Sequence, residues 1–127
     1  VSEVLAFDTM LPAPGQGAIA VQTRDEVPLL QTLASIHDMN TALCVTAERA
    51  FLAGLGGGCS VPVGAYAQLE SNQLVLRGRV SSLDGAQQID ITMTANVEGI
   101  QAAYHTGWAL AQSAMEKGAR ALMEAQP

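Results

Sequence analysis

Four glycines within residues 54–58 constrain the fold of this chain more than any other feature of its sequence. They follow residues 40–54, which show the strongest helical pattern in the chain, and they stand directly before Cys59 and Pro62. Glycine at this density ends a helix and costs backbone entropy when the chain folds. The cluster therefore separates a helical part of the chain from a strand-rich part. It also implies that something approaches this bare backbone closely, or that the cysteine is presented in a special way.

Residues 40–54 are predicted to form an amphipathic helix. Asn40 or Thr41 can cap its first turn, and the neighbours Glu48 and Arg49 are expected to point apart on its surface. The apolar residues recur at helical spacing and share one face of the helix. They are Leu43, Ala47, Ala50, Phe51 and Leu55.

The region before this helix reads as a connection, a hinge, a strand and a short helix. Prolines in "LPAPG" favour extended backbone at the end of residues 1–14, and "GQG" at residues 15–17 is predicted to be a turn or a hinge. The apolar run at residues 18–23 predicts a largely buried strand. Residues 27–38 predict a short helix with Pro28 in its first turn. The chain opens without a helix start or a turn, so we expect it to be a piece of a longer protein.

After the glycines, three strand-like segments are separated by short polar turns. The short links between residues 61–69, 73–82 and 87–95 predict an antiparallel meander. The second and third of these segments alternate in character along the strand, which predicts one apolar face and one more polar face. Residues 97–125 are predicted to be helical, with a break at Gly118. The predicted fold class is α+β: a three-stranded antiparallel sheet covered by helices. The small-residue packing stripe of the last helix consists of Ala103, Gly107, Leu110, Ala111, Ala114 and Met115.

Composition limits the partners of this chain. Its formal net charge is −6, from twelve acidic and six basic residues without a basic cluster, which argues against binding to nucleic acid or to anionic membranes. No apolar run is long enough to span a bilayer, and no secretory signal opens the sequence. We therefore expect a cytoplasmic protein. Arg77 and Arg79 share the polar face of one strand, which is either simply exposed or an anion-binding surface.

The cysteines and histidines indicate no metal site. Cys44 and Cys59 form no CxxC unit, so neither zinc nor a redox dithiol is indicated. Both a disulfide between them and two reduced thiols remain open, and a cytoplasmic location favours the thiols. His37 and His105 have no carboxylate or cysteine at ligand spacing. Cys44 lies among apolar neighbours of the helix and is expected in the core.

Cys59 is the residue with the strongest indication of chemistry. One reading is a small apolar side chain in a tight turn. The other is a nucleophilic thiol on an accessible loop, which suits a covalent attachment point. The glycines also suggest a phosphate-binding loop, but no Lys-Ser/Thr pair and no helix follow them, as such a loop requires.

Three blocks of sequence together resemble the C-terminal part of the porphobilinogen deaminase family. They are "LPAPGQGAIAVQ", "TAERAFLAGLGGGCSVPVGAYA" and "GWALAQSAMEKGARALM", and their order and spacing match across essentially all 127 residues. The resemblance implies a dipyrromethane cofactor linked by a thioether to Cys59. It also implies that four porphobilinogen units are added to this primer with loss of ammonia, after which the linear tetrapyrrole is released by hydrolysis.

The resemblance further implies a division into domains. Residues 1–36 would combine the end of a second domain, a hinge and a segment returning to a first domain, and residues 37–127 would be the third, cofactor-carrying domain. Gly57 and Gly58 would leave room for the growing oligopyrrole. Gln16, Gly17 and Ala18 would lie at the hinge, where backbone amides can meet cofactor carboxylates.

Other parts of the family's active site are absent from this sequence. The catalytic aspartate and the arginines that bind the acetate and propionate groups belong to the first two domains, so no catalytic residue is assigned here. We expect the chain to be inactive without those N-terminal domains, and residues 1–36 to be disordered, repacked on the third domain or used for self-association. A stand-alone α+β binding or interaction module without catalysis is the alternative. Metal or thiol redox sensing is a weaker one.

Overall fold

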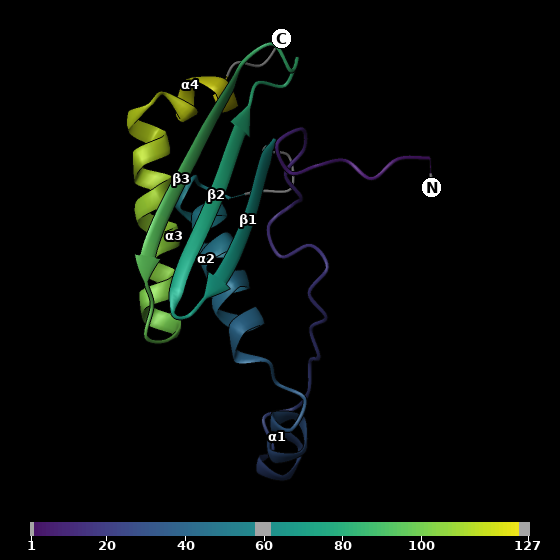
Figure 1. The fold of residues 1–127 in the computed structure, drawn as a ribbon. Helices are drawn as coiled ribbons and strands as arrows, with labels where there is room; N and C mark the ends of the chain where they lie inside the picture. The colour runs from purple at the N-terminus through teal and green to yellow at the C-terminus, as the bar shows by residue number, and fades with distance from the viewer. Residues whose placement is uncertain (1, 58–61, 125–127) are drawn as a thin grey trace.

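The structure, a computed structural model, describes residues 2–57 and 62–124 and forms a sheet with helices packed on one face (Figure 1). The three strands form one antiparallel sheet in the order β1-β2-β3, which confirms the predicted α+β fold. The strands are β1 (Val63–Glu70), β2 (Gln73–Ser81) and β3 (Gln88–Asn96). The helices are α1 (Val27–Ala34), α2 (Met39–Gly54), α3 (Ile100–Glu116) and α4 (Ala119–Glu124).

The core lies between the sheet and helices α2 and α3. On the central strand β2 every second residue is buried, as the alternation predicted; these residues are Leu74, Leu76, Gly78 and Val80. Gly78 pairs with Ala65 on β1 and with Ile91 on β3. A Cβ atom at Gly78 would lie 2.5 Å from the ring of Phe51, which is fully buried. The glycine therefore lets helix α2 rest its largest apolar side chain directly on the sheet.

Helices α2 and α3 approach each other through small residues. A Cβ atom on Gly107 would collide with the carbonyl oxygen of Ala47 and would lie 2.8 Å from the Cβ atom of Ala50. At the other end of the contact, a Cβ atom on Gly54 would lie 2.6 Å from that of Ala111. The predicted small-residue stripe of α3 is thus the surface on which α2 packs. All five residues of the predicted apolar face are buried, four of them on α2 and the fifth, Leu55, at its C-cap.

Helix ends differ from the sequence prediction at two places. The N-cap of α2 is Asp38, not Asn40 or Thr41, because the Asp38 carboxylate accepts the backbone N–H of Thr41 at 2.7 Å. Helix α1 ends at Ala34, four residues before the predicted end at residue 38. The break at Gly118 is confirmed, since this residue has a φ of +96° between α3 and α4.

The predicted strand at residues 18–23 is wrong. These residues form no strand, and Ile19 and Val21 are 95% and 58% exposed. A strand is stable only when a neighbouring strand pairs with it, and β1 to β3 pair only among themselves. Helix α1 follows this segment and lies away from the sheet and its covering helices (Figure 1). It has no buried residue.

The segment before the hinge packs on the sheet. The Phe7 ring lies 4.1 Å from the Tyr66 ring between centroids, and Leu11 is buried. Arg77 donates to the Asp8 carboxylate at 2.6 Å, and Arg79 donates to the Asp90 carboxylate, also at 2.6 Å. Both arginines on the polar face of β2 are therefore paired with carboxylates of the same chain.

None of the helices in the described part of the chain combines the length and the apolar character needed to cross a membrane.

We predict that Gly107→Ala destabilises the fold by about 1–3 kcal/mol, because the added methyl group would overpack the contact between α2 and α3. On an exposed helix face the same substitution would stabilise by about 1 kcal/mol, so the sign of the effect tests the packing. Urea unfolding followed by circular dichroism measures it. Gln112→Ala, on the exposed face of α3, is the control, and a Gly107→Ala variant as stable as the native chain would contradict the prediction.

Candidate functional site

Helix α2 ends in a hydrogen-bonded glycine turn directly before the predicted attachment cysteine. The N–H of Gly57 donates to the carbonyl of Leu52 at 3.1 Å, and the N–H of Gly56 donates to the carbonyl of Ala53 at 3.0 Å. This pair of bonds, with a left-handed residue at Gly56, defines a Schellman motif. Gly56 has a φ of +91° and Gly57 a φ of +24°, a region that favours glycine.

The glycines of this turn serve different purposes. Gly54 allows α3 to pack closely, whereas Gly56 and Gly57 form the turn that ends the helix. Among the described residues, a Cβ atom on Gly56 would meet no atom within 4 Å, so the backbone there is open on the side of the described structure. Gly58 and Cys59 lie outside the described residues, and the predicted covalent attachment to Cys59 stays a prediction.

The predicted hinge residues form a compact turn. Gln16 closes it twice: its N–H donates to the carbonyl of Ala13 at 2.9 Å, and its Oε1 accepts the N–H of Ala13 at 3.1 Å. Gly15 and Gly17 have φ values of +79° and +89°, which explains the glycine at each position. Ala18 is exposed and donates its N–H to Gly15 at 3.3 Å.

Glu48 connects this turn to the body of the domain. Its Oε2 accepts the N–H of Gly15 at 2.7 Å, and its Oε1 accepts the N–H of Ala67 on β1, also at 2.7 Å. The side chain comes from the middle of α2 and is only 6% exposed. Burial raises the pKa of Glu48 above its ordinary value, and the two hydrogen bonds oppose that shift.

Sequence reasoning missed Glu48, which was expected on the surface of the helix. Its neighbour Arg49 is indeed exposed. The signal lay in the helical spacing, because Glu48 follows Cys44 by four residues and precedes Phe51 by three. Residues so spaced share one helix face, so an acid at this position borders the apolar stripe. A partner for it could not be found from the sequence, because both partners are backbone groups.

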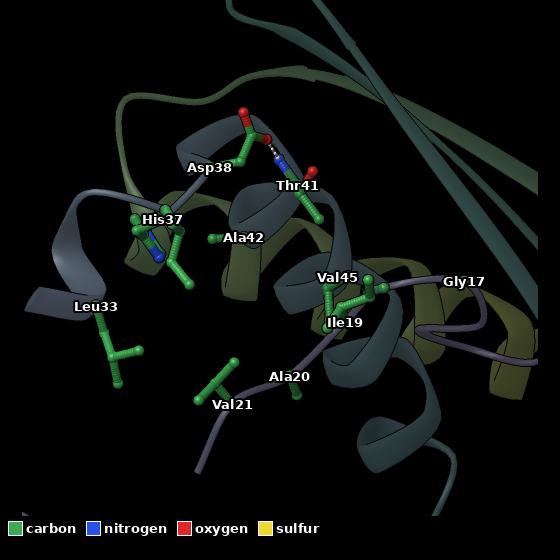
Figure 2. Close-up of a pocket in the computed structure, with 12 residues that line it drawn as sticks. Gly17, Ile19, Ala20, Val21, Leu33, His37, Asp38, Thr41, Ala42 and Val45 are labelled. Carbon is green, nitrogen blue, oxygen red and sulfur yellow. Dashed lines mark hydrogen bonds between the residues drawn. The ribbon is translucent and has the colours of Figure 1, made fainter. Parts of the chain in front are cut away.

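A groove of about 720 Å³ opens between the hinge segment and the helices. Figure 2 shows Val21 of the extended segment and Leu33 of α1 on one side of the groove, and Ala42 and Val45 of α2 on the other. The lining is mostly apolar, with His37 and the N-cap Asp38 as its titratable residues. A groove of this kind suits apolar groups better than an oligopyrrole with many carboxylates.

The described part of the chain brings together few reactive groups. Cys44 packs against the edge of the core and is half-buried, so the expected core position holds only in part. Burial first, and the charge of Glu48 second, raise the pKa of the Cys44 thiol, which makes it a poor nucleophile. No three His, Cys, Asp or Glu side chains of residues 2–57 and 62–124 are grouped as metal ligands would be.

The predicted cofactor-binding residues lie at two levels along α2. Gly17 and Ala18 line the groove together with Val45 in the N-terminal half of the helix. Gly57 follows the C-terminal end of the helix. From Val45 to Gly54 the helix rises by about 14 Å. A ligand that touches both places must therefore be elongated.

Comparison with known proteins identifies the family. Residues 42–116 match the family model described as "Porphobilinogen deaminase, C-terminal domain". The chain belongs to the porphobilinogen deaminase family. Among curated relatives, the porphobilinogen deaminase of Helicobacter hepaticus is 40% identical over 126 residues, and that of Deinococcus radiodurans is 44% identical over 126 residues. Porphobilinogen deaminase 1 of Streptomyces coelicolor is 42% identical over 130 residues.

These matches cover almost all of this chain but a minor part of each porphobilinogen deaminase. The aligned region is 97–98% of this chain, and it is 39%, 40% and 41% of the three relatives in the order given. The chain thus spans about two fifths of the length of the curated relatives that it matches.

We predict that the buried carboxyl of Glu48 makes stability depend on pH. The pKa of Glu48 is higher in the folded chain than in the unfolded chain, so protonation of this carboxyl stabilises the fold. That stabilisation is fully present below the ordinary carboxyl pKa, and it is lost as pH rises through the pKa of the folded state. The free energy of unfolding of the native chain, relative to Glu48→Gln, should therefore fall as pH rises above the ordinary pKa of a glutamate carboxyl. Urea unfolding at several pH values measures this difference.

Glu98→Gln is the matched control, because it removes an exposed carboxyl and the same charge. A difference between the native chain and Glu48→Gln that is constant over the whole range would contradict the prediction.

Proposed function

We propose that this chain is the cofactor-carrying C-terminal part of a porphobilinogen deaminase, a transferase of tetrapyrrole biosynthesis. The observation that carries the proposal is the match of 97–98% of the chain to curated porphobilinogen deaminases at 40–44% identity. The full protein would condense four porphobilinogen units head to tail, with loss of ammonia, and would release hydroxymethylbilane. A cytoplasmic location belongs to the same proposal.

We propose Cys59 as the attachment residue, through a thioether between its sulfur and a dipyrromethane primer. When bound, the primer supplies the free pyrrole position to which the first porphobilinogen unit would be joined, and each later unit would join the pyrrole added before it. Gly56 and Gly57 hold the chain in the turn that leads to Cys59, and Gly58 would extend the stretch without side chains. In the Gln16–Gly17–Ala18 turn, the backbone N–H of Gly17 would meet carboxylates, because the N–H groups of Gln16 and Ala18 already donate to carbonyls inside the turn.

The described residues fit this group at the end of α2. No atom of the described residues approaches the backbone at Gly56, and the Schellman hydrogen bonds fix Gly56 and Gly57 against the end of the helix. A bulky group on the following loop would therefore not have to displace side chains of this turn. The turn at Gly17 is similarly open, because a Cβ atom there would meet no atom within 4 Å.

The charges of this chain do not fit the whole oligopyrrole. Four of its six cationic side chains are ion-paired: Arg24 with Glu26, Arg77 with Asp8, Arg79 with Asp90, and Arg120 with Glu124. Arg49 and Lys117 are the cations left without such a pair within residues 2–57 and 62–124. An oligopyrrole with several carboxylates needs more positive charge than these two side chains supply. We therefore propose that the N-terminal domains supply the arginines and the catalytic acid.

The N-terminal domains would also cover the exposed segment of this chain, residues 17–36. Residues 17–36 expose apolar side chains, among them Ile19 at 95% and Ile36 at 69%, and line an apolar groove. This supports the proposal that residues 1–36 belong to the first two domains and their hinge, and residues 37–127 to the third. A stand-alone interaction module would expose a similar surface, and loading of Cys59 distinguishes it from the deaminase.

We predict that the complete, active deaminase that contains this sequence carries a dipyrromethane on Cys59. Intact mass measured under denaturing conditions should exceed the sequence mass by one such group, and peptide mapping should place the excess on the peptide that contains Cys59. The peptide that contains Cys44 is the internal control. An unmodified Cys59 from active enzyme, or modification of Cys44 instead, would refute the attachment.

We predict that the 127-residue chain alone does not turn over porphobilinogen, because it lacks the acid and the arginines described above. A chromogenic assay for released tetrapyrrole should give no signal above buffer. Turnover by the purified chain would overthrow this part of the proposal.

A further inference from the structure

Glu48 is a buried carboxylate on α2 whose two oxygen atoms bind two further segments of the chain. It projects from α2, binds the edge of β1 through the N–H of Ala67 and binds the hinge turn through the N–H of Gly15. These two hydrogen bonds join Glu48 to residues that lie 19 and 33 positions away from it in the sequence. Nothing in the catalytic proposal above uses this side chain.

Few ionisable groups of the described residues lie near this carboxylate. The hinge turn, residues 13–18, contains no ionisable side chain. On β1, Tyr66 stacks on Phe7, and Glu70 is exposed at the end of the strand. On α2 itself, Arg49 is exposed, and the thiol of Cys44 is the group whose charge is coupled to Glu48. Two backbone N–H groups therefore replace the water that an exposed carboxylate would bind.

We propose that Glu48 is a positioning residue that fixes the hinge turn to the third domain only in its ionised form. An ionised carboxylate accepts hydrogen bonds on both oxygens, whereas a protonated one has turned one oxygen into a donor. One of the two N–H groups then faces a hydroxyl, which is a much weaker acceptor than a carboxylate oxygen.

The bond to Gly15 is the one that protonation releases. The bond to Ala67 is buried, whereas the bond to Gly15 is part-buried, and an unpaired N–H costs more where water cannot reach it. Protonation would therefore free residues 13–18 while the carboxyl group keeps Ala67. Gly17, whose amide we assign to cofactor carboxylates, would lose its fixed position. This last consequence rests on the proposed function, but the attachment of the turn by Glu48 does not.

Amide NMR of the 127-residue chain tests this inference. In Glu48→Gln the side chain keeps one acceptor oxygen, so we expect exchange of the Gly15 amide with solvent to accelerate about tenfold or more, while Ala67 and the amides of β2 and α3 keep their protection. In the native chain, the Gly15 amide shift should titrate with the same midpoint as the carboxyl carbon of Glu48. Glu98→Gln should reproduce the native chain in both measurements.

Unchanged exchange at Gly15 in Glu48→Gln, or loss of protection throughout the sheet together with Gly15, would overturn the inference. If the variant does not fold, the native titration decides, and a Gly15 shift independent of the Glu48 carboxyl refutes it. These readouts involve no cofactor, so they can fail while Cys59 is loaded, and they can succeed when it is not.

Discussion

Helix α2 holds this structure together, and its close approach to its neighbours is the constraint on which the other contacts depend. It lies against α3 through Gly54 and Gly107, and against the sheet through Phe51 over Gly78. At each of these contacts a single added methyl group would meet an atom at less than contact distance. The interior of a protein is packed too densely to absorb such a change without a shift. The glycines of this chain therefore act largely as packing residues.

The same helix also organises the edge of the sheet. The outward amides of β1 are an open edge that must be paired or covered. Pro12 accepts the N–H of Ala65 at 2.9 Å, and Glu48 accepts the N–H of Ala67 at 2.7 Å. The segment before the hinge and a carboxylate from α2 thus take the place of a neighbouring strand. This arrangement brings the hinge turn beside the domain that carries the proposed attachment loop.

The glycine cluster has both a structural and a chemical interpretation. Gly54 is explained by helix packing, and Gly56 and Gly57 are explained by the turn that ends the helix. These roles would exist in a protein without a cofactor, so the glycines alone do not indicate chemistry. The family match gives Cys59 its proposed role, and the open space beside Gly56 is consistent with a large group nearby.

Local spacing in the sequence determined the helices, the three strands and their apolar faces, because each depends on residues a few positions apart. It predicted the face of α2 from Leu43 to Leu55 and the alternation of β2, and both are confirmed. Only the tertiary structure decided that Glu48 is buried and that Arg77 and Arg79 are paired within the chain. It also decided that residues 18–23 form no strand. These features depend on contacts between residues far apart in the sequence, such as Gly15 with Glu48 and Asp8 with Arg77. Such contacts leave no periodic pattern, because one of the partners is often a backbone group that every residue carries.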